Sequence, residues 1–172
     1  MKIIGKIFNI FGFQVSWWSC VLGVKYGWPY LGPTMMAIYL LIHLYYFRVN
    51  QSEIIFIILV GFIGTIVDTI FLQSSFIIYY GLTVSYIAPI WIIAMWLGFA
   101  ATMNHSFSWV NGKWLIAFII GAIFGPLSYI AGIKFDALFF QETIFSISIL
   151  AIVWGLIVPL LFLLNNKIIQ HK

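Results

Sequence analysis

The sequence predicts an all-α, polytopic membrane protein, a compact bundle of about six transmembrane helices that forms a single domain over residues 1–172. Of these residues, 64% are hydrophobic and only 7% are charged, whereas a soluble domain is about 45–50% apolar and about 25% charged. Eight basic and four acidic side chains are too few to cover a surface in water, so lipid must surround the fold. A spanning helix takes about 20 apolar residues, which leaves no room for an additional soluble domain.

Six apolar segments follow one another, separated by connections that contain charged residues, Gly-Pro or Asn. The predicted spans are residues 6–24, 28–47, 54–73, 86–109, 114–133 and 143–164. The first segment has Trp17 and Trp18 where a signal peptide would have a small-residue cleavage site, so we interpret it as a retained span. The one longer connection, residues 74–85, is uncharged and aromatic, which favours a position in the membrane interface.

Lys and Arg are distributed unequally between the two sets of connections, and this bias predicts the orientation. With a cytoplasmic N-terminus, only Lys25 and Lys134 lie outside. The remaining basic residues lie inside, namely Lys2, Lys6, Arg48, Lys113, Lys167 and Lys172. We therefore expect both termini to face the cytoplasm, with the bacterial inner membrane as the host of so compact a chain.

The charge pattern and the cysteine count exclude several kinds of site. The basic residues stand singly at span ends, so no stripe can neutralise consecutive phosphates, and nucleic-acid binding is not expected. A single cysteine, Cys20, cannot form an intramolecular disulfide or a cysteine-based metal cluster. No Gly-x-Ser-x-Gly motif is present, and no second carboxylate within a span can complete an acid/base pair.

Asp68 is the acidic residue expected to lie deep inside a span. It is 15 residues past Glu53, as Ser128 is 15 residues past Lys113, so both rise about 22 Å from the inner boundary and share a level. Small and polar residues recur at helical spacing along one face of the third segment and along one face of the fifth. This predicts that the third and fifth helices pack closely. The two stripes are Gly61, Gly64, Thr65 and Asp68, and Gly121, Gly125, Ser128 and Gly132.

Burying a charged, unpaired carboxyl costs at least about 2.5–3.5 kcal/mol, so Asp68 is a functional-site hypothesis. The ligand-binding candidates at this level are Asp68, Ser128, Tyr129, Trp91 and Thr65. The alternative is a protonated Asp68 that only joins helices by hydrogen bonds.

A second polar layer is expected near the inner surface, formed by Gln14, His43, Asn104 and His105. Structural hydrogen bonding between helices and a binding or proton-relay role are both open for it. Two histidines and two amides lack the carboxylate or cysteine that usually completes a zinc site, so we expect no metal and no cofactor.

Residues spread over almost the whole chain carry a family resemblance: Phe13-Gln14, Trp17, Cys20, Tyr26-Gly27, Pro29, Gly32, Ala88-Pro89, Trp91, Trp96, Phe99-Ala100, Thr102, Asn104-His105-Ser106, Gly125-Pro126-Leu127-Ser128-Tyr129 and Gly132. On these residues the chain resembles a bacterial integral membrane family known as domain of unknown function 2878. The resemblance implies no activity. Members of the family often stand beside genes for cyclopropane-type fatty-acyl modification, which implies a link to lipid chemistry.

Three functions remain open from the sequence. The protein could bind or transport a small or lipid-like molecule through a polar pocket around Asp68, using helices broken at Pro89, Pro126 and Pro159. It could be a lipid-modifying enzyme or an accessory to one, or a structural or substrate-binding membrane subunit of a larger complex. Expected partners are membrane lipids and a small or lipid-like ligand, and a protein partner is left open.

Overall fold

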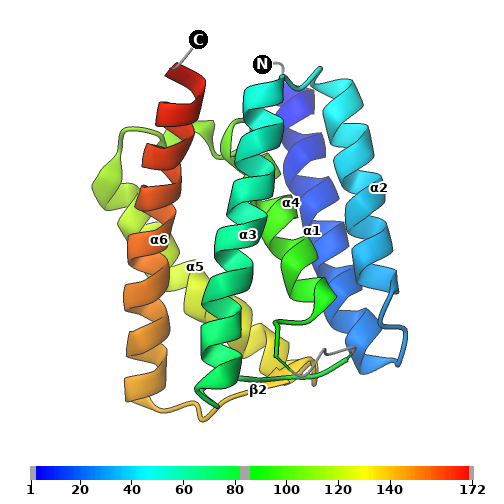
Figure 1. The fold of residues 1–172 in the computed structure, drawn as a ribbon, viewed down its shortest axis with the longest axis vertical. Helices are drawn as coiled ribbons and strands as arrows, with labels where there is room; N and C mark the ends of the chain where they lie inside the picture. Colours follow the sequence, from blue (N-terminus) through cyan, green and yellow to red (C-terminus); the bar gives the residue numbers. More distant parts are fainter. Residues whose placement is uncertain (1–2, 82–85, 171–172) are drawn as a thin grey trace.

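The computed structural model describes residues 3–81 and 86–170, and this part of the chain folds into a bundle of six α-helices (Figure 1). The helices are α1 (Ile3–Lys25), α2 (Leu31–Tyr46), α3 (Gln51–Gln73), α4 (Ile90–Met103), α5 (Trp114–Lys134) and α6 (Ile144–Gln170). Four of them, α1, α3, α5 and α6, are long and apolar enough to cross a membrane, whereas α2 and α4 have 16 and 14 residues. The helical class predicted from the sequence is therefore confirmed.

The bundle has two distinct ends. Helix α1 begins and α6 ends at the same end, which we call the terminal end (Figure 1). At the opposite end, β1 (Ile78–Tyr79) pairs antiparallel with β2 (Leu138–Phe139), and we call this the ribbon end. The exposed Lys25 and Asp136 form an ion pair of 3.1 Å that joins the end of α1 to the segment before β2. The closest helix pairs are α1 with α2, α3 with α4, and α5 with α6.

The outer faces of the long helices are apolar, as a lipid environment requires. Phe62 on α3, Phe124 on α5 and Leu160 on α6 are 64%, 63% and 58% exposed. The polar residues Asn9, His43, Asp68 and Thr102 are instead buried. An apolar exterior around a polar interior would be unstable in water and is typical of helices that face hydrocarbon.

Helix α4 is much shorter than the predicted span over residues 86–109. Pro89 has extended backbone angles and lies directly before the first helical residue, Ile90, because the pyrrolidine ring favours a helix start and disfavours helical geometry in the preceding residue. The Thr69 hydroxyl accepts a hydrogen bond from the Ala88 backbone N–H at 3.1 Å, which satisfies this non-helical segment. The other end stops at Met103, and a short 3₁₀ helix, η1 (Ser108–Val110), follows.

The prolines in α5 and α6 do not break these helices, contrary to the expectation of broken helices at Pro126 and Pro159. Helix α5 runs from Trp114 to Lys134 and α6 from Ile144 to Gln170, each with its proline inside the helix. Neighbouring helices can support the backbone groups that a proline leaves free. Only Pro89 therefore marks an interruption of the three.

The expected close packing of the third and fifth helices is wrong. A Cβ added to Gly64 of α3 would lie 1.9 Å from Trp96 of α4, whereas one added to Gly125 of α5 would lie 2.3 Å from Trp154 of α6. Each stripe of small residues therefore accommodates an indole from a different helix, and α3 packs mainly on α4 and α5 mainly on α6. Small residues allow a close approach, but their spacing does not identify the partner.

Candidate functional site

The Asp68 cluster consists of Asp68, Tyr79, Trp96 and Tyr129, whose polar atoms meet in the interior. The Tyr79 and Tyr129 hydroxyls lie 2.5 and 2.6 Å from Asp68 Oδ1, and the Trp96 indole Nε1 lies 2.6 Å from Oδ2. Helices α3, α4 and α5 and strand β1 each contribute one of these residues. Asp68 is only 1% exposed, so the carboxyl belongs to the protein interior.

Among the described residues, the side chains that contact Asp68 are hydrogen-bond donors, and none of them is a cation. The ion pairs found among the described residues are Lys25–Asp136, His43–Glu53 and His105–Glu53, and none of them involves Asp68. Burial, reinforced by Tyr129 and Asp68, raises the pKa of Tyr79 on β1 well above its usual value, which keeps this phenol a proton donor. The carboxyl is thus held by two phenols and an indole, all neutral.

The remaining sequence candidates at this level do not touch the carboxyl. Ser128 donates to the Gly125 carbonyl at 2.6 Å and Thr65 to the Gly61 carbonyl at 2.6 Å, both within their own helices. Trp91 is buried, packs against the Tyr79 ring at 6.1 Å and donates to the Tyr80 carbonyl. Among the five candidates, the structure therefore brings together Asp68 and Tyr129.

An aromatic layer of Trp96, Phe99, Tyr129 and Trp154 lies beside the Asp68 cluster. The Trp96 and Trp154 rings are stacked, with centroids 4.7 Å apart and an interplanar angle of 8°. Trp154 also packs against Tyr129 at 6.3 Å. Its buried Nε1 lies near the Tyr129 hydroxyl but has no well-formed hydrogen bond among the described residues.

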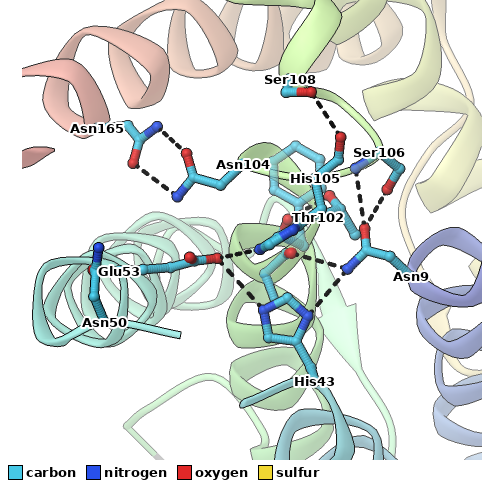
Figure 2. Close-up of polar contacts among 12 residues, drawn as sticks. Asn9, His43, Asn50, Glu53, Thr102, Asn104, His105, Ser106, Ser108 and Asn165 are labelled. Carbon is cyan, nitrogen blue, oxygen red and sulfur yellow. Dashed lines mark hydrogen bonds and ion pairs between the residues drawn. The ribbon is translucent and has the colours of Figure 1, made fainter. Parts of the chain in front are cut away.

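The two-histidine cluster consists of Asn9, His43, Glu53 and His105 (Figure 2). It lies at the terminal end, where α2 ends and α3 begins (Figure 1). Glu53 Oε1 lies 2.7 Å from His105 Nε2 and 3.5 Å from His43 Nε2. The two imidazole rings are 4.8 Å apart in an edge-to-face arrangement. Asn9 and His43 are both 0% exposed, while Glu53 and His105 are 8% and 9% exposed, so the cluster is buried but close to the surface.

Local structure explains how Glu53 reaches the histidines. Asn50 caps α3 by accepting the Glu53 backbone N–H at 2.9 Å, which fixes Glu53 in the first helical turn. A negative side chain is favourable there because the helix N-terminus carries a partial positive charge. His43 lies in the last turn of α2 and His105 just after α4, so their polar atoms converge at one end of the bundle.

One of the four residues expected in the inner polar layer needs correction. Gln14 is exposed on α1 and lies outside the two-histidine cluster, and Asn9 takes the place predicted for it. Five residues along a helix turn the side chain by about 140°, so these two amides cannot face the same way. Asn104, directly before His105, forms a reciprocal amide pair with Asn165 of α6, with distances of 3.2 and 2.5 Å.

The sequence analysis missed Glu53, Asn9, Tyr79 and Trp96. Glu53 marks the membrane boundary in the sequence, and its place in the first turn beside an Asn cap signals a carboxylate at the depth of His43 and His105. His43, Glu53 and His105 form a potential metal-ligand set, since their ligand atoms all lie within 4.8 Å of one another. This supplies the carboxylate whose absence argued against zinc, because two histidines and a glutamate form a known zinc-ligand set.

The apolar exterior, the four long helices and the two buried polar clusters define a helical bundle of the membrane-protein class. The chain belongs to the family described as Protein of unknown function (DUF2878), whose model matches residues 6–160. The family predicted from the sequence is therefore confirmed. Searches of curated proteins and of solved structures found no significant match.

Proposed function

We propose that the protein is a multi-pass protein of the bacterial inner membrane, with six spans and cytoplasmic termini, that binds or transports a small or lipid-like molecule at the Asp68 cluster. The observation that carries this proposal is the environment of Asp68, a carboxyl 1% exposed whose three hydrogen-bond partners are neutral. A buried carboxyl needs a proton or a positive charge nearby. A ligand that supplies either would therefore bind at Asp68.

The surroundings of Asp68 favour a ligand that is partly apolar. Trp96, Trp154 and Tyr129 pack on one another beside the carboxyl, and among the described residues Trp154 Nε1 has no well-formed hydrogen bond. Binding sites for small molecules commonly combine apolar walls with a few polar groups that fix orientation. The preferred ligand is accordingly a molecule with a cationic or hydrogen-bonding group on an apolar body.

Access to Asp68 is easiest to explain from the ribbon end. Tyr79 is the donor that comes from a two-residue strand, whereas Trp96 and Tyr129 belong to helices. A displacement of the ribbon would free one side of the carboxyl without moving a helix. Tyr79 would then be the donor that a ligand replaces.

Asp68→Asn tests this function because it changes charge with little change in shape. The asparagine oxygen can accept from Trp96 and its amide can donate to the tyrosine hydroxyls, so all three hydrogen bonds have a counterpart. Native mass spectrometry of the purified wild type should show a bound molecule distinct from bulk lipid. Asp68→Asn should reduce its occupancy at least tenfold and leave the melting temperature almost unchanged.

Asp136→Asn is the matched control, since this carboxylate is exposed and pairs with Lys25. The control variant should retain the molecule. If Asp68→Asn retains it as well, or if the wild type carries bulk lipid alone, the proposed binding role is wrong. A fall in melting temperature with unchanged occupancy would assign Asp68 a structural role.

A further inference from the structure

We propose that the two-histidine cluster binds one divalent transition-metal ion through His43, Glu53 and His105, and that the Asn9 amide limits the affinity of this site. The three ligand atoms all lie within 4.8 Å of one another. Glu53 lies 15 residues before Asp68 on α3, about 22 Å along the helix axis. Metal binding is therefore independent of the ligand proposed for Asp68 and can be measured separately.

The ligand atoms are spaced nearly as a metal ion requires. Glu53 Oε1 lies 2.7 Å from His105 Nε2 and 3.5 Å from His43 Nε2. Neighbouring ligand atoms around tetrahedral zinc are about 3.3–3.6 Å apart, because each bond is about 2.0–2.2 Å long. Side-chain shifts of about 1 Å would therefore bring all three atoms to bonding distance of one ion.

His43 Nε2 is a buried polar atom without a strong partner. His43 is 0% exposed, and its Nε2 has no well-formed hydrogen bond among the described residues. The distance of 3.5 Å to Glu53 Oε1 is longer than an ordinary N–H···O hydrogen bond. Figure 2 shows this nitrogen directed toward the Glu53 carboxylate. A metal ion bound between them would give the buried nitrogen the partner that it lacks.

The backbone holds the three ligands in place from three different elements. Glu53 lies in the capped first turn of α3, and His43 lies in the last turn of α2. His105 directly follows the C-cap of α4, and its backbone N–H donates to the Thr102 carbonyl at 3.1 Å. The centroid of the Phe47 ring lies 4.1 Å from that of His105 and 5.0 Å from that of His43. An apolar shell of this kind limits the access of water, which strengthens metal–ligand interactions.

The ligand types indicate which ions fit the site. Two imidazoles and a carboxylate form a known zinc-ligand set, in which the fourth position is open to water or substrate. Calcium and magnesium instead take about six or more ligands that are mainly oxygens, which two histidines cannot supply. The fitting class is thus a divalent transition-metal ion, and Zn²⁺ is the suitable probe because it has no redox chemistry.

The Asn9 amide opposes the form of His43 that binds metal. Coordination through Nε2 requires a proton on Nδ1, and metal-bound histidines usually donate this proton to an acceptor. Asn9 Nδ2 instead presents a donor 3.2 Å from His43 Nδ1. The amide is oriented by the Ala101 carbonyl oxygen, 3.1 Å from Nδ2, and by the Ser106 backbone N–H, 3.3 Å from Oδ1.

Turning the Asn9 amide over resolves this conflict at a moderate cost. The turned amide would place its oxygen against His43 Nδ1–H and the Tyr39 hydroxyl, which can donate, and its NH₂ against the Ser106 hydroxyl, which can accept. The hydrogen bonds with the Ala101 carbonyl and the Ser106 N–H would be lost. Asn9 therefore weakens metal binding without blocking it, whereas an aspartate would offer an acceptor oxygen to Nδ1 in either orientation.

Zinc analysis of the full-length protein tests the ligand set. The protein is purified with a tag that lacks histidine, stripped with a chelator, incubated with Zn²⁺ in lipid nanodiscs and desalted. The wild type should retain about one zinc per chain, whereas His43→Gln, Glu53→Gln and His105→Gln should each retain less than about a tenth of that amount. Glu142→Gln, at an exposed acid, and His171→Gln, outside the described residues, are matched controls and should retain the zinc.

Melting temperatures separate loss of the site from loss of the fold. Zn²⁺ should raise the melting temperature of the wild type and of the controls, because it binds the folded state, and should leave that of the three ligand variants unchanged. Asp68→Asn should still retain zinc, so a failure of the Asp68 proposal and a failure of this one are distinguishable.

Asn9→Asp completes the test, because misfolding cannot produce a gain in affinity. A carboxylate behind a metal-bound histidine typically accounts for about a 10–100-fold difference in affinity. This variant should therefore bind Zn²⁺ at least about tenfold more tightly than the wild type in competition with a chromophoric chelator. The control Asn166→Asp places the same charge on α6 and should leave the affinity unchanged. A wild type that retains less than about a tenth of a zinc per chain, a ligand variant that retains as much as the wild type, or an Asn9→Asp variant that binds no more tightly would each overturn the proposal.

Discussion

A single polar side chain in this bundle can form hydrogen bonds with several buried groups, and its contribution to stability depends on how many it satisfies. Asn9 is the clearest case, because its amide contacts the Tyr39 hydroxyl, His43 Nδ1, the Ala101 carbonyl and the Ser106 N–H. Helices α1, α2 and α4 and the turn after α4 therefore meet at one residue. Its loss would leave several buried polar groups without partners at the same time, and such groups are costly in a low-dielectric interior.

Asn9→Leu should therefore lower the free energy of unfolding by at least about 2 kcal/mol, since each orphaned buried group costs about 1–3 kcal/mol. Gln14→Leu is the matched control, because it removes an amide from the exposed face of the same helix, and it should change stability by less than about 0.5 kcal/mol. Denaturant titration in detergent micelles measures both. Equal effects of the two substitutions would contradict the assigned role of Asn9.

At the residue scale, the type of a side chain predicts that it is buried, but it does not predict which residues form hydrogen bonds with it. Asp68 could be assigned to the interior because hydrocarbon does not tolerate an exposed carboxyl. The donors to it come from strand β1 and from two helices distant in sequence, and no local pattern pairs Tyr79 or Trp96 with Asp68. Gln14 and Asn9 show the same limit, because two amides five residues apart on one helix can be distinguished only when the neighbouring helices are known.

Glycines allow neighbouring helices to pack closely, because a tryptophan ring or the backbone of the adjacent helix occupies the space where a Cβ would lie. A Cβ at Gly121 of α5 would lie 2.2 Å from the Trp154 carbonyl oxygen of α6, an atom that cannot move without the helix. A Cβ at Gly132 of the same helix would instead lie 2.9 Å from Cδ2 and Cγ of Leu138, which are side-chain atoms and can shift more easily than a helix backbone. The two positions therefore distinguish backbone contact from side-chain contact.

Gly121→Ala should destabilise the protein by about 1–3 kcal/mol, the usual cost of overpacking. Gly132→Ala should cost less, since the Leu138 side chain can shift with a smaller displacement of the fold than the α6 backbone. Thermal unfolding monitored by tryptophan fluorescence would report both. A larger effect at Gly132 than at Gly121 would contradict the packing of α5 on α6.

At the scale of elements, runs of hydrophobic residues predict where the helices lie, and proline or turn residues determine where they end. The spans predicted over 54–73 and 114–133 lie within α3 and α5 and differ from them by a few residues at most. The segment over 86–109 is longer than α4 because Pro89 and the turn after Met103 interrupt a continuously apolar stretch. The pairing of β1 with β2 joins residues about 60 positions apart, and a two-residue strand has no periodicity that could predict it.

In the whole molecule, the two clusters lie at different depths of one bundle, one at the terminal end and one further toward the ribbon end. The Lys25–Asp136 ion pair is exposed and contributes at most about 1 kcal/mol. The ion pair shows that Lys25, one of the two basic residues predicted to lie outside, is at the ribbon end. The predicted orientation places the two-histidine cluster at the cytoplasmic end of the bundle.

Reporter fusions test this arrangement most directly. A fluorescent protein joined after the C-terminal residue should be fluorescent, and alkaline phosphatase at the same position should be inactive. Phosphatase inserted at Glu142, between β2 and α6, should be active, because this loop is at the ribbon end. Active phosphatase at the C-terminus, or inactive phosphatase at Glu142, would contradict an inner-membrane bundle whose terminal end and two-histidine cluster face the cytoplasm.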